Sequence, residues 1–443
     1  MIPALLEAGV QVVLVDNIHF DRCVQDYPFS TGENLFPPNP ADQRMPNTTV
    51  THWVGLQGVW DPSKVSVPYG YQPHYVQYTD PVTGLVSSII AFPGARYEGV
   101  EDARGGFGAL DYAYVMGQLA FANTDEAHPV FVMLAHDGDN YGGGTDSYYQ
   151  GNWQSMISWL QSDSSFECST VADYMQQYPP SVDDIIHVED GSWSGANNGD
   201  PLFLKWNPDW FSPVYEPERN SFLVMIAGMN RVLTANTIAP YGSLENVLQG
   251  TGTATEKALH FMLVSQASDY EYWPTVQQWN SDPTIGVNTA CIFADQVITG
   301  NSQAETTPPT IFLPQREFWN PGAVNWNPGK PDPAVFGIST AVYDVSGVAM
   351  VTLYTLFSYG VTAPTPAMLL YSAPGRWVTT ILQPTAAVPS QTDPLPNYIA
   401  NLYTTNVTCG ICGGLISYYV MATDSINNVQ RSPIQHVYVP SQK

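Results

Sequence analysis

The residues best suited to chemistry form a turn rich in glycine and acidic side chains. Residues 136–142 read HDGDNYG and directly follow the apolar run PVFVMLA at 129–135. Such a run predicts a strand covered on both faces, and the glycines allow a sharp turn where it ends. Asp137 is the first carboxylate after that strand. A carboxyl group whose pKa is raised by burial or by other acids can protonate a glycosidic oxygen, so Asp137 is the candidate general acid.

Two further apolar runs also end in polar residues. VQVVLV at 10–15 is followed by Asp16 and His19, and DIIHV at 184–188 is followed by Glu189 and Asp190. Parallel strands of α/β proteins present their carboxyl ends at one edge, where active sites lie. We therefore expect Asp137 to meet a second carboxylate there, and the candidates are Glu189, Asp190 and Asp16. Taken singly, each such acid is more often a helix cap or a loop ligand than a catalyst.

A metal-binding interpretation competes for the same residues. Asp137, Asp139 and Asp146, with Gly142 between them, partly resemble a calcium-binding loop. Tyr148 stands where an EF-hand has an acid, so the pattern is not an EF-hand. A structural calcium ion is thus one alternative and no cofactor is required. A second alternative is a divalent metal at Asp16 and His19, helped by His136 or Asp137. A third alternative is a purely structural role, in which these acids cap the helix after Gly144.

Aromatic residues accompany polar ones at two further places. Ser268 and Asp269 precede Tyr270, Tyr272 and Trp273, and Trp193 lies in the sequence GSWSG. Sugars stack their C–H faces on such rings, although rings packed in a core would look the same from the sequence. The candidate substrate-binding residues are therefore His19, Asp139, Tyr141, Trp193, Asp269 and Trp273.

Composition narrows the class of protein and of partner. The chain has 443 residues, with 14 Lys and Arg against 40 Asp and Glu, a net charge of −26. This charge disfavours nucleic acid and anionic membranes as partners. No apolar stretch reaches membrane-spanning length. Five cysteines predict no disulfide framework. Little Lys and abundant Asn, Ser, Thr, Tyr and Gly indicate an extracellular or periplasmic protein, although the first residues do not form a convincing signal peptide.

The distribution of apolar runs and turn-forming residues along the chain predicts an α/β region followed by β-structure. Apolar spacing predicts a helix at 153–160, the richly apolar segments 221–235 and 254–267 predict two more, and a short strand is expected at 85–91. Near residue 304 a proline-rich segment begins, and short β-rich runs then alternate with turns. We predict a partial (β/α) barrel-type catalytic domain at 1–220, a helical segment completing it at 221–303, and an antiparallel β-sandwich of immunoglobulin or fibronectin type at 304–443.

Several short segments, taken in their order along the chain, resemble motifs of glycoside hydrolase family 57, a retaining α-glucan-active family. HDGDNYGGG resembles the family motif in which the first Asp is the acid/base, which is Asp137 here; Asp139 and Tyr141 replace the usual Glu and Phe. IPALLEAGVQVVLVDNIHFDR, QASDYEYW and GSWSG also resemble family segments. The resemblance implies an incomplete (β/α)7 barrel. The family's nucleophile Glu would lie upstream of Met1, so its motif and the first barrel strands are absent from this sequence.

The expected function is an amylase-like α-glucan glycoside hydrolase acting on starch or an oligosaccharide. One alternative is a non-catalytic α-glucan-binding remnant, and another is a metal-dependent carbohydrate enzyme such as a deacetylase. An oligomer is expected if another chain replaces the missing strands. Carboxylates about 5–5.5 Å apart would indicate retention, and a separation of roughly 6.5–9.5 Å would indicate inversion.

Overall fold

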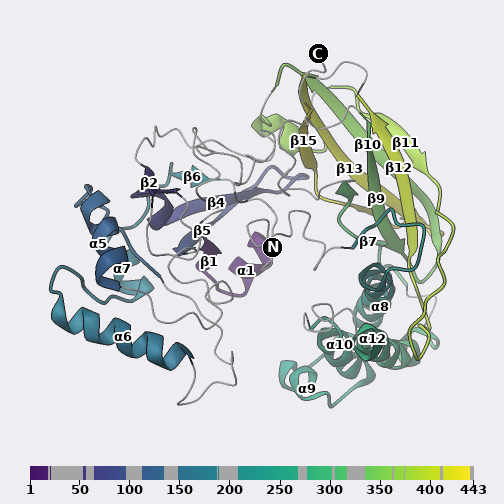
Figure 1. The fold of residues 1–443 in the computed structure, drawn as a ribbon. Coiled ribbons are helices and arrows are strands. Elements are labelled where there is room, and N and C mark those ends of the chain that lie inside the picture. Colours follow the sequence, from purple (N-terminus) through teal and green to yellow (C-terminus); the bar gives the residue numbers. More distant parts are fainter. Residues whose placement is uncertain are drawn as a thin grey trace. The chain divides into compact units, whose positions relative to one another are not determined.

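The computed structural model describes the larger part of the chain. The described residues are 1–17, 20, 53–55, 64–95, 112–133, 148–186, 188, 208–267, 277–301, 305–316, 335–361, 364–373, 375–409 and 413–439. Contacts divide the chain into two compact units, Met1–Glu189 and Asp190–Lys443 (Figure 1). Each unit is described by itself below, and the domain boundaries expected from the sequence stay a prediction.

The first unit contains a four-stranded mixed sheet. In spatial order its strands are β1 (Val12–Asp16), β5 (Val86–Gly94), β4 (His74–Thr79) and β6 (Ile185–Ile186). β1 runs parallel to β5, and β4 and β5 form an antiparallel hairpin. β6 is parallel to β4. The hairpin therefore reverses the sheet, and β6 runs in the opposite direction to β1.

The first unit also contains helices and short strands outside this sheet. They are α1 (Ile2–Glu7), β2 (Trp53–Gly55), β3 (Lys64–Ser66), the 3₁₀ helix η1 (Tyr69–Tyr71), α5 (Tyr112–Ala122), α6 (Tyr148–Ser162) and α7 (Val171–Gln177). Val115, Met116 and Leu119 of α5 share a core with Tyr71. The rings of Tyr112 in α5 and Trp159 in α6 stack with their centroids 5.8 Å apart, which fixes the two helices together.

The second unit begins with a helical group. Its helices are α8 (Pro217–Ile238), α9 (Leu244–Gln249), α10 (Ala254–Val264) and α12 (Gln277–Ile298). Val224 of α8, Met262 of α10 and Val287 of α12 belong to one buried cluster. α10 starts with a reciprocal capping box between Thr253 and Glu256, which satisfies two of its free amide groups.

Two antiparallel sheets follow the helices and enclose a common core. One sheet consists of β11 (Val378–Leu382), β10 (Val348–Tyr359), β13 (Gly414–Asp424), β14 (Val429–Arg431) and β15 (Gln435–Val439). The other consists of β12 (Asn401–Thr408), β9 (Val335–Tyr343), β7 (Thr310–Ile311) and β8 (Gln315–Arg316). A further 3₁₀ helix, η5, spans Pro366–Leu369. Ile338 and Tyr403 from one sheet and Leu353 and Tyr418 from the other are buried in that core.

The helical group and the two sheets are joined within the second unit. Ile226 of α8 and the preceding Trp210 share a cluster with Ala341 of β9 and Ala400. Arg231 of α8 adds a polar connection, because its guanidinium donates to Asp295 in α12 and to the Tyr343 hydroxyl at the end of β9. The helices and sheets of this unit therefore form one packed body.

Several predicted elements are confirmed and one is not. The strand at 10–15 corresponds to β1, the strand at 85–91 to β5, and the predicted helices at 153–160, 221–235 and 254–267 to α6, α8 and α10. Residues 129–133, the described part of the run PVFVMLA, form no strand. Among the described helices, none is long and apolar enough to cross a membrane. The expected (β/α)7-type barrel stays a prediction.

Candidate functional site

The carboxyl end of β1 marks the sheet edge at which the sequence places its chemistry. Asp16 is the last residue of β1 and pairs with Gly94, the last residue of β5. The Asn17 amide donates to the Gly94 carbonyl at 2.9 Å, which continues the pairing beyond the strand, and Asn17 is buried. Both parallel strands therefore end at the same level.

The segment that leads to Asp137 reaches the same edge. The Phe131 amide donates to the Tyr71 carbonyl at 3.1 Å, and the Ala95 amide donates to the Met133 carbonyl at 2.8 Å. Ala95 directly follows β5. Residues 131–133 thus approach the end of β5 through single hydrogen bonds rather than through a strand ladder, which is why residues 129–133 form no strand.

A buried histidine lies at the same end of the sheet. His74 is the first residue of β4, is 1% exposed, and pairs with Ala91 near the end of β5. Its Nδ1 lies 2.7 Å from Asp184 Oδ2 and its Nε2 lies 2.9 Å from the Tyr69 carbonyl oxygen. The Phe20 ring meets the imidazole edge-on at a centroid distance of 5.3 Å. Both ring nitrogens are therefore occupied.

Sequence reasoning does not find the His74–Asp184 pair. Asp184 only begins a predicted strand, and His74 lies in a stretch rich in Pro, Gly and Tyr that predicts loops. A carbonyl oxygen can only accept a hydrogen bond, so Nε2 carries a proton. The second contact then needs another proton, either on Nδ1 or on the Asp184 carboxyl. The pair fastens η1 to the start of both β4 and β6, which is a positioning role.

The directions of the strands separate the three candidates for a second carboxylate. Asp16 ends β1 at the edge where β5 also ends. β6 is antiparallel to β1, and Ile186 pairs with Val76, one residue further from that edge than Ile185 with Tyr75. The chain beyond β6 therefore runs away from Asp16, toward the opposite edge of the sheet.

Most predicted site residues lie outside the described residues. For Asp16 the backbone is described, and Asp137 is not. The others outside the described residues are His19, His136, Asp139, Tyr141, Asp146, Glu189, Asp190, Trp193, Asp269 and Trp273. Their roles as acid/base, second carboxylate, substrate contacts or metal ligands stay predictions. In the part of the chain that is described, a different acidic group, Glu305 with Asp344 and Asp424, has the spacing to hold a metal ion.

Comparison with known proteins shows a similarity that covers this whole chain. No protein-family model matches the chain. An alpha-amylase from Niallia circulans is 23% identical in an alignment of 556 residues that covers 100% of this chain and 42% of the relative. The chain therefore spans about two fifths of the length of the curated relative it matches. This similarity, and not a family model, relates the chain to an alpha-amylase.

Proposed function

We propose that this chain is an amylase-type glycoside hydrolase of the family 57 kind that acts on α-glucan, with Asp137 as its general acid/base. The observation that carries the proposal is the similarity to an alpha-amylase along the whole chain. The order of the motifs in this sequence, with HDGDNYG between the first strand and the late helices, supports the same function. A strongly acidic chain also suits a neutral polysaccharide better than a polyanion.

Asp16 is the second carboxylate that the strand directions favour. Met133 is hydrogen-bonded beside the end of β5, and Asp16 ends the neighbouring strand β1. Asp137 follows Met133 by four residues, which span at most about 14 Å of chain. Asp137 is therefore within reach of the edge at which Asp16 lies. Glu189 and Asp190 follow a strand that runs away from this edge, so they are the weaker candidates.

The two carboxylates would act in succession on the glycosidic bond. Asp137 would give its proton to the leaving-group oxygen, and Asp16 would either attack the anomeric carbon or activate a water molecule. Their separation in the complex decides between retention and inversion. His19, Asp139, Tyr141, Trp193, Asp269 and Trp273 would hold sugar hydroxyls and faces, and secretion would bring the enzyme to its polymeric substrate.

The test is release of reducing sugar from soluble starch by the purified chain and four variants. We expect Asp137→Asn and Asp16→Asn to lower the rate by a factor of about 10²–10⁴, because general acid–base catalysis contributes that much. Glu189→Gln should keep activity. Asp183→Asn is the matched control, since Asp183 is an exposed acid in the same unit. Circular dichroism verifies that each variant is folded.

The other outcomes identify the alternatives. Loss of activity in Glu189→Gln with retention in Asp16→Asn would move the second carboxylate to the opposite edge. A folded wild type that binds α-glucan without turnover would be a binding protein, and the hydrolase proposal would fail. Activity lost in a chelator at a temperature where the fold persists would favour the metal-dependent enzyme.

A further inference from the structure

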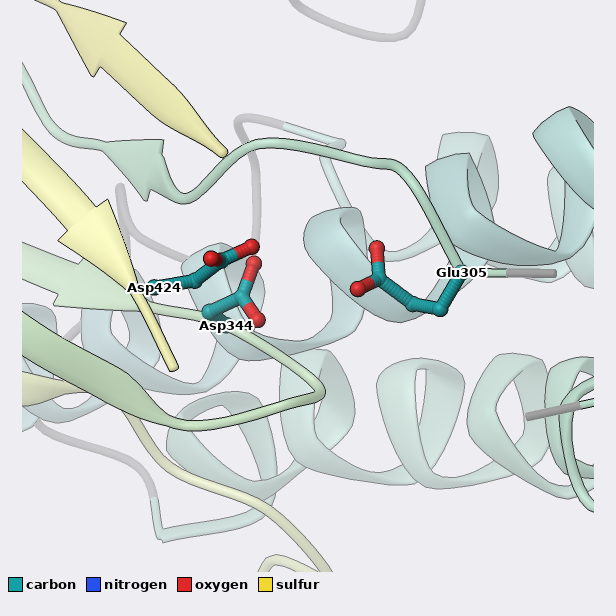
Figure 2. Close-up of side chains that lie close together, drawn as sticks. All are labelled: Glu305, Asp344 and Asp424. Carbon is teal, nitrogen blue, oxygen red and sulfur yellow. The ribbon is translucent and has the colours of Figure 1, made fainter. Parts of the chain in front are cut away.

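Three carboxylates from distant parts of the second unit converge at the end of its two sheets. Glu305 lies between α12 and β7, Asp344 directly follows β9, and Asp424 is the last residue of β13. Each offers an oxygen within 4.8 Å of the others. Figure 2 shows the Glu305 side chain extending toward the carboxylates of the two aspartates. All three side chains are buried, with exposed fractions of 7%, 5% and 1%.

Two of the carboxylates are held by turns that are bonded to each other. Asp344 Oδ1 accepts from the Ser346 amide at 2.8 Å and from its hydroxyl at 2.7 Å. Asp424 Oδ1 accepts from the amides of Ile426 and Asn428, and its Oδ2 accepts from the Asn428 side chain. The Ser425 amide donates to the Gly347 carbonyl at 2.8 Å, which joins the turns. A carboxylate has about four acceptor positions, so each aspartate keeps capacity for a cation.

Glu305 differs in that one of its oxygens is buried and lacks a donor. Its Oε1 accepts from the Thr307 amide at 2.5 Å, whereas Oε2 has no hydrogen-bond partner among the described residues. Glu305 is more than nine-tenths buried, and its carboxylate faces Asp344 and Asp424 (Figure 2). A buried acceptor without a donor is costly, so this oxygen indicates a ligand that completes the group.

The charge of the group also lacks compensation from the part of the protein that is described. Among those residues, no Lys, Arg or His forms an ion pair with Glu305, Asp344 or Asp424. Burial raises the pKa of Glu305, and the neighbouring carboxylates of Asp344 and Asp424 raise it further. Buried charges are normally paired or bound to a metal. A bound cation would offset the repulsion among the three carboxylates and would give Oε2 of Glu305 a partner.

We propose that Glu305, Asp344 and Asp424 bind a calcium ion that locks the segment before β7 to the turns after β9 and β13. The donors are all carboxylate oxygens, which suits a hard cation, and no described His or Cys belongs to the group as zinc would favour. Two oxygens on one calcium ion lie at most about 5 Å apart, since each bond is about 2.3–2.6 Å long. The spacing in this group satisfies that limit.

The ion would also fasten the sheets to the helices. Asn230 of α8 is buried, and its Oδ1 accepts from the Val345 amide at 2.9 Å, one residue after Asp344. Its Nδ2 donates to the Pro308 carbonyl and to the Thr310 hydroxyl at 3.2 Å each. The segment carrying Glu305 and the turn carrying Asp344 therefore meet on α8. Calcium at this point would stabilise the second unit as a whole.

The test is calcium-dependent thermal unfolding of the full chain after dialysis against EDTA and then against metal-free buffer. Wild type should gain about 5–10 °C in the Tm of the second unit at a hundredfold excess over the dissociation constant. Glu305→Gln and Asp344→Asn should lose this shift. Both are close in size to the native residues and remove a repelling charge, so they should fold without calcium. Glu245→Gln, an exposed acid in the same unit, should keep the shift.

Calorimetric titration with CaCl₂ complements the unfolding experiment and does not depend on activity toward starch. We expect a binding event in wild type that is absent from Glu305→Gln and Asp344→Asn. No heat and no Tm shift in folded wild type up to about 10 mM CaCl₂, ten times the weakest affinity usual for extracellular modules, would overturn the proposal. An unchanged shift in both variants, or a larger shift with MgCl₂ than with CaCl₂, would also overturn it.

Discussion

The contact between α8 and α12 should not tolerate one added methyl group. A Cβ built on Gly228 of α8 would lie 2.5 Å from Val287 Cγ1 of α12 and 3.3 Å from Met262 Sδ of α10. Carbon atoms in contact prefer about 3.5–4.0 Å. Val287 is 1% exposed and is packed on its other sides, so it has little room to withdraw. We therefore expect Gly228→Ala to separate the helices.

The expected change in the free energy of unfolding for Gly228→Ala is the sum of two opposing effects. Alanine favours a helix interior over glycine by about 1 kcal/mol. Overpacking a well-filled core costs about 1–3 kcal/mol, and a 2.5 Å approach belongs at the upper end of that range. The net loss in the free energy of unfolding should therefore be about 2 kcal/mol. In a unit of this size the Tm should fall by about 4–8 °C.

A double-mutant cycle isolates the clash from other effects. Val287→Ala removes Cγ1 and should by itself destabilise the second unit, but in the double variant it should also make room for the methyl group added by Gly228→Ala. We expect a favourable coupling of at least about 1 kcal/mol, measured by urea unfolding. Gly117→Ala in α5 is the control, because an added Cβ there meets no described atom within 4 Å; it should stabilise the first unit by about 1 kcal/mol. Unchanged stability in Gly228→Ala, or strict additivity in the cycle, would refute the reasoning.

Three further predictions concern polar groups that are buried or partly buried. Asp295→Asn should cost the second unit about 2–4 kcal/mol in thermal unfolding, because it weakens the pairing of the Arg231 guanidinium; a cost below about 0.5 kcal/mol would contradict this. His74→Phe should cost the first unit about 2–4 kcal/mol, since it removes the ring that bonds both Asp184 and the Tyr69 carbonyl; a neutral result would show that the pair is not structural. Burial and the adjacent carboxyl of Glu218 raise the pKa of Glu216 to about 8, so its stabilising contribution is full below about pH 4.5 and disappears as the pH rises through 8. The Tm advantage of wild type over Glu216→Gln should shrink from pH 5 to pH 9, and an advantage that grows would reverse the assigned direction.

Local patterns predict these helices because long apolar segments must be buried in a folded chain. The segments that form α8 and α10 are richly apolar, and both helices share the cluster around Val224 and Met262. The predicted strand at 129–135 is wrong for its described part, residues 129–133. Its apolar character predicts burial, and Phe131 is indeed partly buried, but burial alone does not specify a strand. Its backbone instead forms separate hydrogen bonds with Tyr71, Ala95, the Asn123 side chain and the Tyr174 hydroxyl.

Long-range groups are beyond the reach of local patterns. His74 and Asp184 are 110 residues apart, and neither belongs to a motif. Asp344 directly follows β9 and Asp424 ends β13, where acids commonly stabilise turns, and Glu305 lies in the segment before β7. The pairing of β10 with β13 brings Val348, just after the turn of Asp344, opposite Asp424, and the contacts of Asn230 bring the segment of Glu305 to the same place. From the sequence each acid looks like an ordinary turn residue, and only the fold places the three carboxylates close together.

The direction of one strand bears most directly on the proposed chemistry. From the sequence we expect three strands to end at one edge, as in a parallel sheet. The hairpin of β4 and β5 reverses the sheet, so β6 ends away from β1. If the catalytic carboxylates follow this arrangement, Asp16 is required and Glu189 is dispensable. If Glu189 is instead required, β6 cannot run in the opposite direction to β1 in the active protein. The kinetics of Asp16→Asn and Glu189→Gln therefore test the strand order and the catalytic assignment together.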